Sequence, residues 1–110
     1  MECKLYIHGD SVQTIVSLLE QQFGAAKTKA GCYFFPEFDI CFDRNDEADA
    51  NKMRTYPDGF LYYEWIADLD IYDHYIRITD TILKLLWENR FPAVASCDYE
   101  AELNRYIFSL

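Results

Sequence analysis

The segment from Gly59 to Ser96 constrains the fold most, because it holds the clearest alternation of polar and apolar residues and both tryptophans. Residues Phe60–Ile71 alternate with a period of two, which predicts a strand. An apolar stripe at helical spacing follows over Asp73–Asn89, and Pro92 then precedes a short apolar run, Ala93–Ser96. The segment therefore predicts a strand, a deeply buried helix and a second strand.

The N-terminal part predicts another strand and helix. Residues Cys3–His8 alternate, which is typical of a half-buried strand. Asp10 and Gln13 form a capping-box pattern before an apolar helical stripe, and Gly24 lies where a helix C-cap is expected. Residues Glu37–Asp43 alternate again and predict a further strand.

This order of elements predicts an α+β fold of the ferredoxin-like type, β-α-β-β-α-β, with a four-stranded antiparallel sheet and two helices on one face. Residues 25–31 are interpreted as a basic linker and residues 44–58 as a long charged loop. The length and the absence of a linker between domains indicate a single domain, 1–110. A closing C-terminal helix is expected after Asp98, from apolar residues at helical spacing: Tyr99, Leu103, Ile107 and Leu110.

Charge limits the classes of partner. The chain has a net charge of −9, and 17% of its residues are aromatic. Acidic and basic residues cancel over 1–31, so the excess negative charge lies in 32–110. Such a surface repels phosphate backbones and anionic lipid and attracts basic proteins. We therefore expect a basic protein partner, no nucleic acid and no membrane; the alternative is that the acidity serves solubility alone.

The N-terminus begins directly on a strand-like pattern, and no apolar run approaches the roughly 18–20 residues of a membrane span. We therefore expect a cytoplasmic protein whose four cysteines are reduced. The predicted fold makes the first and last strands antiparallel neighbours. Cys3 is then expected near Cys97, as a buried thiol that could form a bridge only on oxidation.

Two stretches resemble the signature strands of the RNA-recognition motif. Lys4–Gly9 resembles the first, and Asp58–Trp65 resembles the second. The resemblance implies that Tyr6, Phe60 and Tyr62 face outward and stack on bases.

The second stretch departs from that motif in its charge. Asp58 replaces the basic residue that contacts phosphate, and Leu61 replaces a small residue. The predicted strand also places Glu64, Asp68 and Asp70 on the proposed stacking face. We therefore expect a degenerate motif, and RNA binding remains an alternative function.

Neither a metal site nor a cofactor site is expected. Residues Asp43–Asp49 resemble the start of an EF-hand calcium loop, but Ala48 stands where that loop needs glycine and Arg54 where it needs glutamate. The cysteines show no CxxC spacing.

We also expect no enzyme activity, because the sequence contains no recognisable catalytic motif. His8 and His74 are the only histidines. A Cys97–His8 nucleophile pair is disfavoured, because the predicted sheet places the two residues at opposite ends. His74 is interpreted as a surface residue.

The C-terminal half resembles a group of small, uncharacterised bacterial proteins, some of which look like immunity proteins of toxin systems. The resemblance covers residues 58–103, including the run Pro92–Leu103. It implies an inhibitor that neutralises a cognate toxin by occluding its active site or substrate groove. The alternatives are an RNA-recognition-like module and a small dimeric ligand-binding or regulatory domain, and the oligomeric state stays open. The residues expected to bind the partner are acidic and aromatic: Asp43, Asp46, Glu47, Asp49, Phe60, Tyr62, Glu64 and Asp68.

Overall fold

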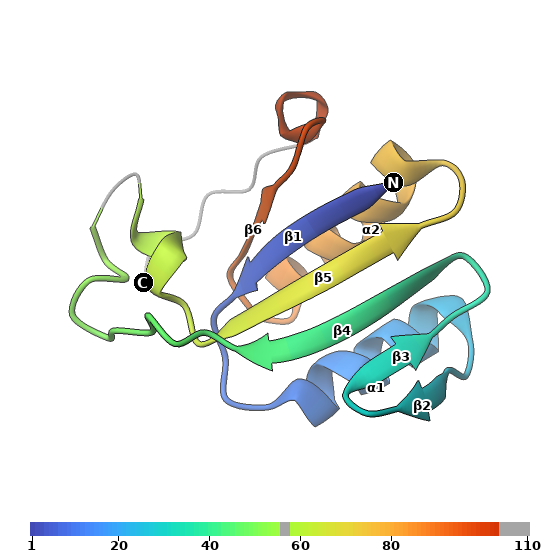
Figure 1. Cartoon of the computed structure of the whole chain (residues 1–110), viewed down its shortest axis with the longest axis horizontal. Coiled ribbons are helices and arrows are strands. Elements are labelled where there is room, and N and C mark those ends of the chain that lie inside the picture. Colours follow the sequence, from blue (N-terminus) through green and yellow to red (C-terminus); the bar gives the residue numbers. More distant parts are fainter. Residues whose placement is uncertain (56–57, 104–110) are drawn as a thin grey trace.

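The computed structural model describes residues 1–55 and 58–103. These residues form a six-stranded antiparallel sheet with the order β2-β3-β4-β5-β1-β6, and both α-helices lie on one of its faces (Figure 1). None of the described helices is long and apolar enough to cross a bilayer. The elements are β1 (Glu2–Ile7), α1 (Val12–Phe23), β2 (Lys27–Lys29), β3 (Cys32–Phe34), β4 (Phe38–Arg44), the 3₁₀ helix η1 (Gly59–Tyr62), β5 (Trp65–Ile71), α2 (Tyr75–Glu88), β6 (Ala93–Ser96) and the 3₁₀ helix η2 (Glu100–Glu102).

The predicted four-stranded ferredoxin-like sheet is wrong, because the residues interpreted as a basic linker begin a hairpin. β2 and β3 pair with each other through a turn at Ala30 and Gly31, and β3 pairs with β4. Both turn residues have positive φ, 53° and 82°, as the tightest hairpin turns require. All three residues of β2 are exposed. This edge strand is held by backbone hydrogen bonds, so it leaves no apolar alternation in the sequence.

The predicted strand Phe60–Ile71 is also wrong in its first half. The chain forms η1 over Gly59–Tyr62, and β5 begins only at Trp65. A Cβ atom on Gly59 would lie 2.2 Å from the backbone oxygen of Met53. The preceding loop therefore packs directly on this glycine, and that contact sets the path of the chain before β5.

The predicted C-terminal helix is not found in the described part of the chain. After β6, Tyr99 and Leu103 are buried, but only the short 3₁₀ helix η2 separates them. Ile107 and Leu110, the other residues of the predicted stripe, lie outside the described residues.

The helix starts differ slightly from their predicted positions. Ser11, not Asp10, caps α1, and its Oγ accepts a hydrogen bond of 3.2 Å from the Thr14 amide. α2 begins at Tyr75, after His74 in a left-handed conformation. The core lies between the helices and the inward face of the central strands, and its fully buried side chains include Leu5, Ile7, Ile15, Leu19, Phe38, Ile40, Leu69, Ile71, Ile82 and Leu86.

The expectation of four reduced cysteines is wrong for one pair. Cys32 and Cys41 lie opposite each other on β3 and β4, with Cα atoms 4.0 Å apart, and form a disulfide. Cys3 and Cys97 are free thiols, and their side chains lie beside each other as expected. Burial, followed by the hydrogen bond with Cys97, raises the pKa of the Cys3 thiol.

A buried hydrogen bond fixes the chain after β6 to α2. The hydroxyl groups of Thr79 and Tyr99 lie 2.9 Å apart, and both side chains are buried. The Tyr99 ring also packs edge-on against Tyr75, with ring centroids 4.7 Å apart.

We expect Thr79→Val to lower the free energy of unfolding by about 1–3 kcal/mol, because it leaves a buried tyrosine hydroxyl without a strong partner. The other neighbour of that hydroxyl is the thiol of Cys3, a weak hydrogen-bonding group. Tyr99→Phe should cost less, about 0.5–1.5 kcal/mol, since a helical threonine can bond to a carbonyl of the preceding turn. Urea denaturation measures both; two variants as stable as the parent would contradict the prediction.

Candidate functional site

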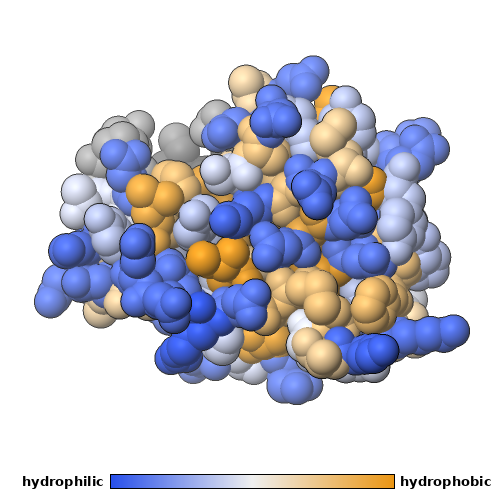
Figure 2. All heavy atoms as spheres, in the orientation of Figure 1, coloured by the Kyte–Doolittle hydropathy of each residue, from blue (hydrophilic) through white to orange (hydrophobic). Residues whose placement is uncertain are grey.

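The face of the sheet opposite the helices carries a row of carboxylates. The strand register places Glu2 of β1 opposite Asp70 of β5, and Asp70 opposite Asp39 of β4. Asp68 is exposed on the same face of β5. Figure 2 shows this face, where hydrophilic side chains cover much of the sheet and hydrophobic patches lie between them. Like charges directly opposite each other on neighbouring strands destabilise a sheet.

The row is only partly neutralised. The ammonium group of Met1 lies 3.4 Å from Asp70 Oδ1. The hydroxyl of Tyr72 donates a hydrogen bond to Asp39 Oδ1. That hydrogen bond, with small contributions from burial and from the nearby carboxylates of Asp39 and Asp70, raises the pKa of Tyr72 to about 12. Glu2 has no ion pair within the described ranges.

Two exposed aromatic side chains flank the carboxylate row. Tyr72 is 58% exposed and Phe34 is 39% exposed. Phe34 lies directly opposite Asp39 in the β3–β4 pair, so it shares the open face. The open face therefore combines negative charge with aromatic surface that a partner could bury.

The loop acids predicted to bind a partner lie beside this face and differ in exposure. Asp43 is exposed near the end of β4, and Asp46 and Glu47 are exposed in the following loop. Asp49 is half-buried, and its Oδ1 accepts hydrogen bonds from the amides of Asn51 and Lys52, at 2.9 and 3.3 Å. Its carboxylate therefore supports the loop itself.

Phe60 and Tyr62 lie on η1 and not on the open sheet, which removes the arrangement implied by the RNA-recognition resemblance. Phe60 is half-buried and packs edge-on against Tyr6, with ring centroids 5.4 Å apart. Lys52 Nζ lies 5.3 Å from the centroid of the Tyr62 ring. Of the three expected stacking residues, only Tyr6 is on a strand of the sheet.

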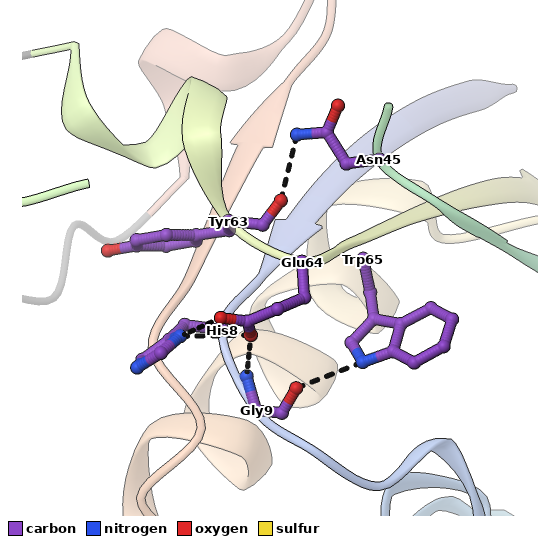
Figure 3. A network of polar contacts seen from close by, with 6 residues as sticks. All are labelled: His8, Gly9, Asn45, Tyr63, Glu64 and Trp65. Atoms are coloured by element: carbon purple, nitrogen blue, oxygen red, sulfur yellow. Dashed lines mark hydrogen bonds and ion pairs between the residues drawn. The ribbon is translucent and has the colours of Figure 1, made fainter. Parts of the chain in front are cut away.

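Glu64, which immediately precedes β5, binds His8 (Figure 3). Its carboxylate oxygens lie 2.8 and 3.0 Å from His8 Nδ1. Oε2 accepts a further hydrogen bond of 2.7 Å from the Gly9 amide. Because an ionised carboxylate can only accept hydrogen bonds, Nδ1 carries a proton whether the ring is neutral or protonated.

Gly9 is held from two further sides. Its carbonyl oxygen accepts a hydrogen bond of 2.9 Å from Trp65 Nε1 (Figure 3). A Cβ atom at this position would lie 2.5 Å from Cδ1 of Phe91. Only glycine fits here, and the contacts around it fix the backbone that carries His8. The residues His8, Gly9, Glu64 and Trp65 line a pocket, together with Asp10, Arg44, Arg90 and Phe91.

The arrangement around His8 orients an imidazole, and the described residues that line the pocket include no hydroxyl or thiol side chain. Cys97 lies near the start of β1 and His8 follows its end, as expected. His74 is exposed, with Nε2 3.5 Å from Asp73 Oδ2. In the described part of the chain, no three His, Cys, Asp or Glu side chains cluster as a metal site would require.

Asn45 is a structural residue that the sequence did not reveal. It is 6% exposed, and its Nδ2 donates hydrogen bonds of 2.8 Å to the carbonyl oxygens of Leu61 and Tyr63. Its Oδ1 accepts from the Glu47 amide at 3.0 Å. These bonds join the acidic loop to the segment before β5, and an asparagine in a polar loop gives no sequence signal for them.

We expect Asn45→Ala to lower the free energy of unfolding by about 1–3 kcal/mol, because two carbonyl groups lose their donor. Asn51→Ala is the control, since Asn51 is exposed in the same loop and a change there should cost less than about 0.5 kcal/mol. Urea denaturation compares the two variants, and equal losses of stability would contradict the assigned role.

We expect Glu2→Gln to raise the free energy of unfolding by about 0.2–1 kcal/mol at low salt, because it removes one like-charge pair from the row. The gain should largely disappear near 1 M salt, where the screening length falls to about 3 Å. Glu102→Gln, at an exposed position away from the strands, is the matched control. A Glu2→Gln protein less stable than its control would show that the row is not a site of repulsion.

No family model, curated protein or solved structure matches this chain. The geometry of its surface and pocket is therefore the basis for the functional argument.

Proposed function

We propose that this chain is an acidic protein-binding inhibitor, most specifically an immunity protein that neutralises a basic toxin domain by occluding its active site or substrate groove. The observation that carries the proposal is the sheet face opposite the helices, where, among the described residues, three carboxylates lie side by side and two aromatic side chains are exposed. The immunity role is the part of the proposal that takes up the expected resemblance of residues 58–103 to small bacterial proteins of this kind.

The carboxylate row fits a cationic partner for an energetic reason. Glu2, Asp39 and Asp70 repel one another in the free protein. A partner that places lysine or arginine side chains on the row relieves this repulsion when it binds. Proteins retain locally unfavourable arrangements mainly where function requires them. The row therefore supports a binding surface more strongly than a general need for solubility.

The flanking aromatic residues provide the second element of an interface. Long-range attraction between an acidic and a basic surface increases the association rate. Most binding energy usually comes from a few buried anchors, among which tyrosine is enriched. Tyr72 and Phe34 are placed for that role on either side of Asp39. The exposed loop acids Asp46 and Glu47 extend the negative surface.

The same charge argues against two other occupants of the face. A second copy of the chain would bring a like-charged row against the first, so a homodimer through this face is disfavoured. RNA would bring phosphate groups to the carboxylates.

The proposal is tested first at the adjacent gene, which we expect to encode a protein with a basic C-terminal domain, and then by co-expressing the chain with that domain. We expect the chain to restore growth to cells that make that domain. We also expect Asp68→Asn with Asp70→Asn to slow association of the purified proteins about tenfold at low salt. Glu88→Gln with Glu102→Gln changes the net charge equally at exposed positions off the face and should leave the rate nearly unchanged.

Two results would count against the proposal. Failure to restore growth would reject the immunity assignment for that domain. Equal effects of the two double variants would show that net charge, and not the open face, controls association. Tight binding of single-stranded RNA at low salt would favour the alternative function.

A further inference from the structure

The pocket beside His8 is distinct from the carboxylate row and goes beyond the proposed inhibitor function. It forms where the chain leaves β1, ends β4, enters β5 and turns after α2. Its volume is about 580 Å³, within the range of small-molecule sites, about 300–1,000 Å³. Trp65 and Phe91 give it an apolar wall.

Basic groups gather in this pocket although the chain as a whole is acidic. Arg44 and Arg90 both line it, and neither forms an ion pair with another residue in the described ranges. The guanidinium carbon of Arg44 lies 5.2 Å from the centroid of the Trp65 ring. Stacking on an aromatic face positions a guanidinium group while its in-plane N–H donors stay available.

The pocket also contains two carboxylates, Asp10 and Glu64, so it gains a net positive charge only when His8 is protonated. Glu64 is already bonded to His8 and to the Gly9 amide. Asp10 is exposed. Because Glu64 fixes the imidazole through Nδ1, Nε2 of His8 is left to bond a ligand. In its protonated form Nε2 donates a hydrogen bond, as the two guanidinium groups do.

Arg90 occupies a backbone position that favours glycine. Its φ is 66°, and it follows the C-cap Asn89 of α2. The Phe91 amide donates to the Leu86 oxygen at 2.8 Å and the Arg90 amide to the Trp87 oxygen at 3.1 Å. This is the Schellman arrangement, in which glycine usually takes the left-handed position. Arginine is thus held there at a conformational cost.

We propose that this pocket binds an oxyanion, a carboxylate or a phosphate group, attached to an aromatic or apolar body. The guanidinium groups of Arg44 and Arg90 and Nε2 of His8 contact the oxyanion, and Trp65 and Phe91 contact the body. The site shares no residue with the carboxylate row, so the experiments that test it are independent of those that test the inhibitor proposal.

The test is a titration of the ¹⁵N-labelled protein followed by NMR, with phenyl phosphate, benzoate and uncharged phenol as probes. Concentrations up to about 10 mM detect a Kd near 1 mM, a binding free energy of about −4 kcal/mol. We expect saturable shifts of the Gly9 amide and the Trp65 indole N–H with at least one anionic probe. A response to phenyl phosphate alone identifies a phosphate ester, and a response to benzoate alone identifies a carboxylate. No saturable shift with either anion, or equal shifts with phenol, would overturn the proposal.

Two variants test whether the arginine residues of the pocket bind the anionic probe. Arg90→Gly removes a guanidinium group at a position where glycine is conformationally favoured, so the fold should be kept and the melting temperature unchanged or raised. Arg44→Gln removes the second one. Each should weaken binding of the responsive probe about tenfold or more, as expected for loss of a charge-assisted hydrogen bond. Arg77→Gln, at an exposed position on α2, is the charge-matched control and should not change the Kd. Undiminished binding in both pocket variants would refute the assignment.

Discussion

The pairing of β5 with β1 and β4 is the constraint on which the rest of the structure depends. The inward side chains of β5, Ala67, Leu69 and Ile71, are buried beneath the helices. Because side chains alternate along a strand, Asp68 and Asp70 must then face away from the core. A slip of one residue in the register would exchange the two faces. Burial of the apolar face therefore also fixes which carboxylates meet on the open face.

Sequence patterns predicted the parts of the fold that depend on local burial. The alternation at Cys3–His8 and Glu37–Asp43 and the helical stripe before Asn89 correspond to β1, β4 and α2. The hairpin of β2 and β3 was missed because Lys27–Lys29 is held by backbone hydrogen bonds at a sheet edge and buries no side chain. Gly59–Tyr62 was predicted as strand because its alternation continues that of β5. The backbone of the preceding loop packs on Gly59 at Met53, and the period-two alternation of the sequence does not record that contact.

The candidate sites were less predictable than the fold because they depend on register and on long-range pairing. The excess of negative charge was evident from composition. To predict that Glu2, Asp39 and Asp70 are neighbours, however, one must know which residues of β1, β4 and β5 pair with each other. Glu64 was expected to face outward beside Asp68. It lies immediately before β5, and its carboxylate binds His8, 56 positions earlier, which continues the pairing of β1 with β5. Only the fold brings those two side chains together.

The two surfaces have opposite character and lie at opposite ends of the same strands. Glu2 and Asp70 are at one end of β1 and β5, whereas His8 and Glu64 are at the other. Six residues of extended strand separate the ends by about 20 Å. That distance exceeds the screening length of about 8 Å at physiological salt. The charge of the row therefore has little effect on an anion in the pocket, and a cationic partner on the row need not cover it. The sheet thus has room for a protein partner on the row and a small ligand in the pocket, whereas a partner that also contacts Asp46 and Glu47, which follow Arg44, would approach the pocket.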